Sequence, residues 1–167
     1  WWDSGIVGWW HNCTIADSNM HTRLGQNFLV DKNIAKKIVK HSEISALDTI
    51  IEVGPGRGIL TDEMMDISKK IIAVEIDKKL AVALCEKYEG RKNITIINED
   101  FLKYNPPLKR KLKFVANLPY CISTAVISKI LSLSNWDTAV LMVQKEVANR
   151  LRAQPNSPDY SVLSIVC

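Results

Sequence analysis

A polar and conformationally restricted stretch, Asn117-Leu118-Pro119-Tyr120, follows the strand-forming residues 114–116. Pro119 has no N–H group to give to a sheet ladder, so the strand must end there. Ligands of open α/β sheets bind outside the carboxyl ends of the strands. The side-chain oxygen of Asn117 and the carbonyl of Leu118 could accept hydrogen bonds from an amino group, and Tyr120 could stack on a base. The stretch predicts a site for the amino group of a base; a strand-ending turn with a core tyrosine is the alternative.

This stretch resembles motif IV of methyltransferases that modify exocyclic or amide nitrogens, and the resemblance implies methyl transfer to nitrogen. The N6 amino group of adenine is a poor nucleophile because its lone pair is delocalised into the ring. Two acceptors on its hydrogens draw the nitrogen toward tetrahedral geometry, and Pro119 fixes the backbone so that these acceptors converge. A sulfonium donor supplies the electrophile, so catalysis would consist of positioning and electrostatics rather than strong base.

A glycine-rich segment, 52-EVGPGRG-58, joins a predicted strand to a predicted helix. Glycines allow positive φ angles and let a ligand approach the backbone closely. The dinucleotide fingerprint G-x-G-x-x-G would need glycine at position 59, which is Ile59. The observed G-x-G-x-G spacing of Gly54, Gly56 and Gly58 instead resembles motif I of S-adenosylmethionine-dependent methyltransferases. A tight structural turn is the alternative for this motif alone.

Two acidic residues follow the next two predicted strands. An acid about 20 positions after a glycine loop accepts hydrogen bonds from ribose hydroxyls in this architecture, and Glu75 lies close to that distance. Asp100 could accept a hydrogen bond from the adenine amino group of a cofactor, although alone it would suit a turn or a cap. Ile76 and Phe101 follow these acids and would offer apolar contacts. Because the glycine loop and both acids lie at strand carboxyl ends, we expect them to form one cofactor site.

The elements that would position these residues alternate between strand and helix. Asp31 can cap the first helix through its carboxylate. Runs such as residues 71–75 suit strands that are covered on both faces. The alternation predicts a parallel sheet with right-handed crossovers, an α/β Rossmann-like fold. The predicted strands are 49–53, 71–75, 94–97, 114–116 and 138–143, and the predicted helices are 33–41, from about 59, 78–89, 123–133 and 144–153.

Composition favours an ordinary globular protein of 167 residues, with 47% hydrophobic and 24% charged residues. No apolar run approaches the roughly 20 residues that span a bilayer, so no membrane association is expected. The four cysteines are scattered without a CxxC pair, which suits a reducing cytoplasm and argues against a metal site. The net charge of +4 favours a polyanionic partner weakly. The basic block 109–113 could touch phosphate, and a solvated loop is at least as good an interpretation.

Both ends of the sequence differ from the rest. Residues 1–19 contain four of the five tryptophans and show no helical or strand period. We interpret them as a non-native or disordered extension, with an aromatic RNA-stacking arm as the alternative. Residues 20–167 form the predicted catalytic domain. The sequence stops inside the apolar segment 160–167, which suggests a domain truncated at its C-terminus.

Together these motifs resemble the ribosomal RNA adenine-N6,N6-dimethyltransferase family of the KsgA type. The resemblance runs from about Arg23 to Tyr160 and rests on 23-RLGQNFLVD-31, 52-EVGPGRG-58, AVEID, NEDF, NLPY and 143-VQKEVANRL-151. It implies S-adenosylmethionine as cofactor, held by Gln26 or Asn27, Leu29, Gly54, Gly56, Glu75, Ile76, Asp100, Phe101 and Asn117. It further implies that Asn117, Leu118, Pro119 and Tyr120 act at the target adenine. Members of the family methylate two adjacent adenosines of small-subunit ribosomal RNA in an assembly intermediate, and we expect a monomer.

The sequence departs from the family pattern at several positions. Cys121 stands where the family usually has asparagine, and Ala125 stands where it often has proline. The family continues into a last sheet hairpin and a helical C-terminal domain, which this sequence lacks. Two alternatives therefore stay open: an Erm-type methyltransferase of large-subunit ribosomal RNA, and a non-catalytic RNA-binding assembly factor that keeps the fold.

Overall fold

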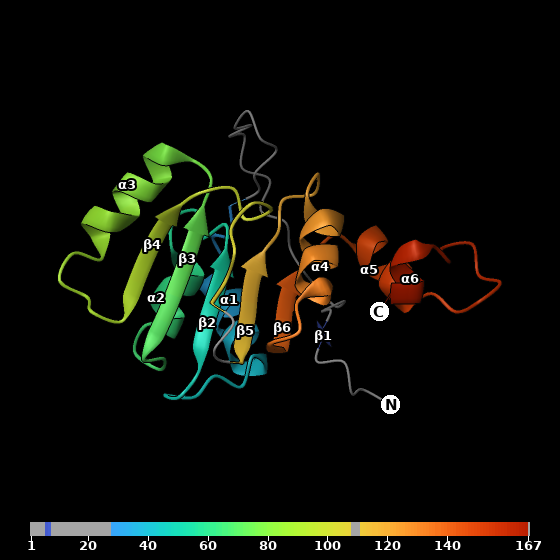
Figure 1. Ribbon diagram of the computed structural model, residues 1–167, viewed down its shortest axis with the longest axis horizontal. Coiled ribbons are helices and arrows are strands. Elements are labelled where there is room, and N and C mark those ends of the chain that lie inside the picture. Colours follow the sequence, from blue (N-terminus) through green and yellow to red (C-terminus); the bar gives the residue numbers. More distant parts are fainter. Residues whose placement is uncertain (1–5, 8–27, 108–110, 167) are drawn as a thin grey trace.

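The computed structural model describes residues 6–7, 28–107 and 111–166, which form a parallel sheet flanked by helices (Figure 1). The strand order is β1-β6-β5-β2-β3-β4, and all five neighbouring pairs run parallel. The strands are β1 (Ile6–Val7), β2 (Thr49–Val53), β3 (Lys70–Glu75), β4 (Ile94–Asn98), β5 (Leu112–Asn117) and β6 (Trp136–Met142). The helices are α1 (Lys32–His41), α2 (Ile59–Met64), α3 (Lys78–Lys87), α4 (Ser123–Ser132), α5 (Lys145–Arg152) and α6 (Val162–Val166).

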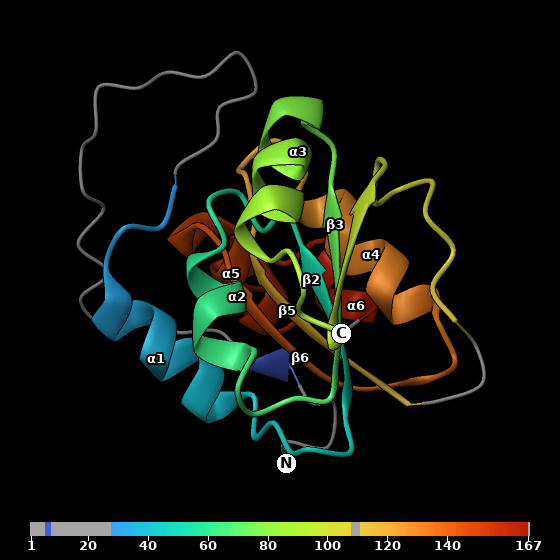
Figure 2. The same cartoon turned by 90° about the vertical axis from the view of Figure 1, so that its left-hand side faces the viewer.

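Hydrophobic layers cover both faces of the sheet. Ile50 and Ile51 are neighbours in β2, and both are fully buried. Successive strand residues point to opposite faces, so Ile50 packs against α1 and α2 while Ile51 joins the layer beneath α4. Figure 2 shows these helices on opposite sides of the sheet. Burial on both faces explains why the strands read as continuous apolar runs, and it confirms the predicted doubly covered parallel sheet.

The strand that carries the functional stretch is longer than expected. The sequence predicts a strand over residues 114–116, whereas β5 runs from Leu112 to Asn117. One further ladder bond follows, from the Leu118 N–H to the Met142 carbonyl (3.0 Å). The ladder cannot continue at Pro119, which has no N–H group. Asn117 is therefore the last residue of β5 and is held at the carboxyl edge of the sheet.

The N-terminal segment contributes a strand that its sequence does not indicate. Ile6 pairs with Ala139 and Val7 with Val140, so β1 lies parallel to β6 at the edge of the sheet. Two residues are too few to show an alternating side-chain period, and backbone pairing does not require one. Residues 1–19 show no strand period in the sequence, and two of them nevertheless pair with β6. The interpretation of that segment as an extension stays a prediction, because its other residues lie outside the described ranges.

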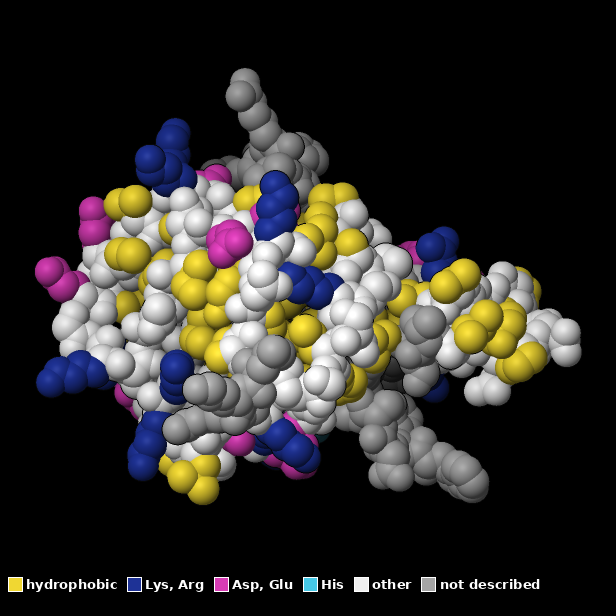
Figure 3. Space-filling view, viewed as in Figure 1, with side chains coloured by type: hydrophobic (Ala, Val, Ile, Leu, Met, Phe, Trp, Pro, Cys, Tyr) yellow, Lys and Arg dark blue, Asp and Glu magenta, His cyan; other side chains and the backbone are white. Residues whose placement is uncertain are grey.

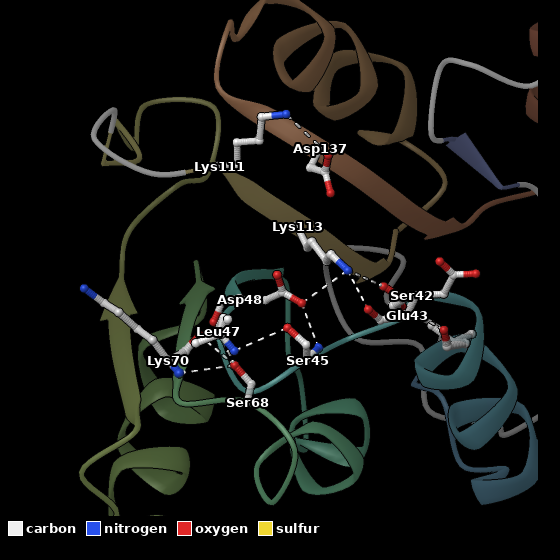
Figure 4. Close-up of polar contacts among 11 residues, drawn as sticks. Ser42, Glu43, Ser45, Leu47, Asp48, Ser68, Lys70, Lys111, Lys113 and Asp137 are labelled. Carbon is white, nitrogen blue, oxygen red and sulfur yellow. Dashed lines mark hydrogen bonds and ion pairs between the residues drawn. The ribbon is translucent and has the colours of Figure 1, made fainter.

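The opposite, amino-terminal edge is tied together by Lys113 of β5 (Figure 4). Its ammonium donates to the carbonyls of Ser42 (3.2 Å) and Glu43 (2.5 Å) and pairs with Asp48 (3.2 Å). These contacts fix the loop between α1 and β2. Lys113 is therefore engaged inside the fold rather than available to phosphate, while Lys111 remains exposed beside Asp137 (3.8 Å). No helix in the described ranges is long and apolar enough to cross a bilayer.

Candidate functional site

A pocket lies where the carboxyl ends of β2, β3 and β5 meet, at the upper edge of the sheet in Figure 1. Six of the residues predicted from the sequence line it: Leu29, Gly54, Gly56, Glu75, Asn117 and Pro119. Phe28, Pro55, Arg57, Ile59 and Leu60 complete its wall. Residues from four separate sequence motifs thus face one cavity, as the sheet-edge argument predicts.

The glycine loop forms the floor of this pocket with its backbone. Gly54 has a φ of +65° and a side-chain Cβ there would meet no atom within 4 Å, so the space beside it is open to a ligand. A Cβ on Gly56 would come within 3.1 Å of the Phe28 ring. The Arg57 guanidinium lies over the same ring, 5.0 Å from its centroid. A ligand in the pocket would therefore meet exposed backbone at Gly54 and the aromatic ring of Phe28 near Gly56. Such surroundings fit a nucleoside-bearing cofactor.

Glu75, at the end of β3, is the acid that holds the loop in place. Its Oε2 accepts a hydrogen bond from the Gly56 N–H (3.0 Å), and its Oε1 accepts one from the Asp77 N–H (2.9 Å). Burial raises the pKa of the Glu75 carboxyl, and these N–H bonds oppose that rise. Each carboxylate oxygen has a second lone pair, so Glu75 can also accept from a ribose hydroxyl at the pocket wall.

The stretch from Asn117 to Tyr120 rims the other side of the pocket. Asn117 and Pro119 belong to the lining, and 37% of the Tyr120 surface is exposed. Leu118 as a whole is 2% exposed and is not among the lining residues, so the acceptor role of its carbonyl stays a prediction. The Pro119 carbonyl accepts a hydrogen bond from the Ser123 hydroxyl (2.9 Å) at the start of α4. Ser123 thus anchors the stretch to α4, and Tyr120 is partly exposed but is not among the lining residues.

Several predicted site residues lie outside this lining. Gln26 and Asn27 fall outside the described residues. Asp100 begins a turn after β4, and its Oδ1 accepts from the Leu102 N–H (2.9 Å). The Phe101 ring is 4% exposed and packs edge-on against a core ring, whereas Ile76 is 52% exposed. Their cofactor roles, like all the individual site assignments, stay predictions.

A buried acid behind the glycine loop was missed at the sequence level. Glu52 of β2 is 1% exposed and accepts a hydrogen bond from the Thr61 hydroxyl (2.5 Å). Its Oε1 has no hydrogen-bond partner among the described residues. Burial raises the pKa of the Glu52 carboxyl to about 8. The available signal was an acid inside the otherwise apolar strand 49-TIIEV-53. The sequence analysis likewise gives no role to Phe28, which lies in 23-RLGQNFLVD-31, or to Arg57, which lies in 52-EVGPGRG-58.

The pKa of Glu52 gives a testable dependence of stability on pH. The carboxyl is protonated in the folded protein up to about pH 8, whereas its ordinary pKa is 4.5. Between these values the folded state binds the extra proton, so the free energy of unfolding decreases as pH rises. We expect Glu52→Gln, which stays neutral, to remove about 3–5 kcal/mol of this decrease. Urea unfolding of both proteins from pH 5 to pH 9 measures it, and a pH-independent difference between them would contradict the assignment.

Comparison with known proteins relates the described fold, apart from β1, to one family. The family "Ribosomal RNA adenine dimethylase" matches residues 17–167. The ribosomal RNA small subunit methyltransferase A of Clostridium botulinum (strain Kyoto) is 40% identical over 148 residues, which are 86% of this chain and 54% of that protein. The chain thus spans about half the length of the curated relatives it matches.

Among the described residues, no three His, Cys, Asp or Glu side chains are grouped to hold a metal ion.

Solved structures agree with this assignment. A dimethyladenosine transferase from Plasmodium falciparum has a TM-score of 0.75 at 33% identity, covering 83% of this chain and 51% of that one. The 23S rRNA methyltransferase ErmE has a TM-score of 0.71 at 34% identity, covering 80% and 52%. The fold is that of S-adenosylmethionine-dependent methyltransferases. Since the family match extends across every motif that meets at the pocket, the chain belongs to the ribosomal RNA adenine dimethylase family.

Proposed function

We propose that this protein methylates N6 of two adjacent adenosines in small-subunit ribosomal RNA, to N6,N6-dimethyladenosine, within an assembly intermediate. The observation that carries the proposal is that Asn117 and Pro119 share one pocket with the glycine loop and Glu75. The proposal assigns the glycine loop and Glu75 to the cofactor, and Asn117 and Pro119 to the amino group of the substrate. A monomer acting in the cytoplasm belongs to the same proposal.

The cofactor side would bind S-adenosylmethionine through backbone and acid contacts. The cofactor supplies an electrophilic methyl group when bound. Glu75 would accept hydrogen bonds from ribose hydroxyls, and the open space beside Gly54 would admit the ligand against the backbone. Leu29 and Ile76 would add apolar contact, Asp100 would accept from the adenine amino group, and Phe101 would support it. Gln26 or Asn27 would complete the site.

The substrate side would hold the adenine amino group against the methyl donor. The Asn117 side-chain oxygen and the Leu118 carbonyl accept its two hydrogens and localise the nitrogen lone pair. Tyr120, exposed at the rim, stacks on the extruded base. With the cofactor bound, its methyl group would pass from sulfur to the amino nitrogen held by Asn117, and the nitrogen would then give its proton to water. Positioning by Asn117 and the backbone therefore supplies most of the rate enhancement.

A ribosomal RNA partner fits the surface charge. The face seen in Figure 3 mixes Lys and Arg with Asp and Glu rather than gathering cations in one patch. On α1, by contrast, four lysines are exposed and none pairs with a carboxylate of the described residues: Lys32, Lys36, Lys37 and Lys40. The helix begins just after Leu29 of the pocket lining. Its cations would meet phosphates near the site.

The ErmE similarity supports one further candidate, methylation of large-subunit RNA. To separate the two, this chain would be incubated with labelled S-adenosylmethionine and either unmethylated small-subunit particles or naked large-subunit RNA. Digestion and mass spectrometry would then count the dimethyladenosine. Label in the small-subunit particle alone supports the proposal, and label in the large-subunit RNA alone favours the Erm-type function. RNA binding without cofactor binding would favour a non-catalytic assembly factor.

Replacing Glu75 tests the cofactor side separately. We expect Glu75→Ala to weaken S-adenosylmethionine binding by about 1–3 kcal/mol, because a charged acceptor for the ribose is lost. Isothermal titration calorimetry measures the dissociation constant. Glu99, an exposed acid at the carboxyl edge next to β4, gives the matched control Glu99→Ala, which should bind normally. An unchanged dissociation constant in Glu75→Ala would rule out ribose recognition there.

A further inference from the structure

Lys129 of α4 makes an unusually complete set of contacts with the turn that follows β4. Its ammonium donates to the carbonyls of Phe101 (2.7 Å), Leu102 (2.9 Å) and Tyr104 (2.5 Å). An ammonium has three N–H donors, and three carbonyls surround this one. The ammonium also lies 5.2 Å from the centroid of the Phe101 ring. Lys129 therefore acts as a cap for a turn whose terminal carbonyls would otherwise depend on water.

The turn so capped carries Asp100. Its backbone carbonyl accepts from the N–H groups of Lys103 and Tyr104 (both 2.9 Å), and its Oδ1 accepts from the Leu102 N–H (2.9 Å). The orientation of the Asp100 carboxylate is thus coupled to the path of the turn. Burial lowers the pKa of Lys129, and the nearby charges of Asp100 and Glu99 oppose that fall.

The same helix anchors the substrate side. Ser123, the first residue of α4, donates to the Pro119 carbonyl, and Lys129 lies six residues along the helix, about 9 Å away at 1.5 Å per residue. A helix is stiff over that length. Figure 2 shows α4 on one face of the sheet with the chain that follows β4 beside it. One rigid element therefore contacts both the Asp100 turn and the Asn117–Tyr120 stretch.

We propose that Lys129 is a positioning residue that orients the Asp100 carboxylate so that it accepts a hydrogen bond from the adenine amino group of the cofactor. Because the same helix holds the substrate stretch Asn117–Tyr120, the two parts of the site keep a fixed position relative to each other. The inference rests on the cofactor role proposed for Asp100. It assigns to Lys129 an effect on ligand discrimination, which a lysine that only stabilised the fold would not have.

The test compares two ligands on three proteins. S-adenosylhomocysteine carries the 6-amino group, and its analogue with unsubstituted purine in place of adenine lacks it. Calorimetry gives both dissociation constants for the wild type, Lys129→Met and Lys103→Met. Lys103 is an exposed lysine of the same turn, and its side chain makes no hydrogen bond or ion pair within the described residues. Its variant therefore removes the same charge nearby and keeps both the cap and the backbone bond to Asp100.

We expect the wild type and Lys103→Met to prefer the adenine ligand by roughly tenfold or more, as for a hydrogen bond to a charged acceptor. Lys129→Met should reduce this preference to about twofold or less. If Lys129→Met does not fold, Lys129→Gln, which keeps an N–H₂ donor, should give an intermediate preference.

Two results would overturn the inference, and they differ from failure of the proposed function. In the first, Lys129→Met weakens both ligands equally and leaves the preference for adenine unchanged, which would make Lys129 a purely structural cap. Where the Met variant does not fold, the same result in Lys129→Gln has the same meaning. A wild type that binds both ligands equally would remove the role of Asp100 and the inference with it. Failure of the wild type to bind either ligand would instead overturn the methyltransferase function and, with it, this inference.

Discussion

Asn117→Ala is expected to leave the fold and cofactor binding largely intact while methyl transfer falls by at least about a hundredfold. Asn117 ends β5, so removing its side chain beyond Cβ does not break the ladder that holds the strand. The adenine amino group loses one of its two acceptors, and losing one preorganised polar contact in a transition state costs about 10²–10³ in rate. Single-turnover methylation of the RNA substrate, with excess enzyme and cofactor, measures the chemical step.

The control for this variant is Asn117→Asp, which keeps an oxygen acceptor at the same place. It should retain more activity than the alanine variant. The dissociation constant for S-adenosylmethionine should change by less than about tenfold in both variants, because Asn117 forms only part of the cofactor wall. Near-normal turnover in Asn117→Ala would remove Asn117 from the catalytic step and leave the Leu118 carbonyl as the acceptor.

The sequence predicted the sheet well because each strand is buried on both faces. Residues 49–53 form a strand with the predicted bounds. Asp31 caps the first helix as predicted, with the Asn33 N–H 2.7 Å from its carboxylate, and the helix begins at Lys32, one residue before the predicted start. Strands such as β5 extend further than their apolar pattern, because Leu112 and Lys113 pair with β6 irrespective of side-chain type. The β1 pairing could not be foreseen for the same reason.

The parts of the site in which a motif constrains the backbone could be predicted from the sequence. The parts that depend on contacts between side chains of distant elements could not. The glycine loop, Glu75 and Asn117 meet because strand carboxyl ends share one edge. Nothing local in the sequence shows that Glu52 is desolvated or that Lys129 reaches the turn after β4. Those facts depend on contacts between distant elements, such as the one from Lys129 to Phe101. Sequence spacing does not encode them.

Gly58→Ala should be the most destabilising of the single substitutions considered, because two costs coincide there. Gly58 has a φ of +78°, which costs an alanine about 1–2 kcal/mol. A Cβ would also come within 2.4 Å of the Tyr88 hydroxyl oxygen. That hydroxyl lies 2.9 Å from the Gly58 carbonyl and 2.7 Å from Asp62, where it can donate. Displacing it should bring the total loss to about 3–5 kcal/mol, measured by urea unfolding.

Gly90→Ala separates the two costs. Gly90 has a similar φ of +80°, but a Cβ there meets nothing within 4 Å, so only the backbone cost of about 1–2 kcal/mol should appear. Tyr88→Phe removes the clashing oxygen, and on that background the cost of Gly58→Ala should fall toward the Gly90 value. Leu84 at 3.0 Å and the Lys87 Nζ at 3.2 Å remain as close contacts of the added Cβ. Equal losses for Gly58→Ala and Gly90→Ala would mean that the ring yields freely. A larger loss at Gly58 that Tyr88→Phe relieves would mean that α3 clamps the glycine loop through Tyr88, so that cofactor affinity and stability should fall together.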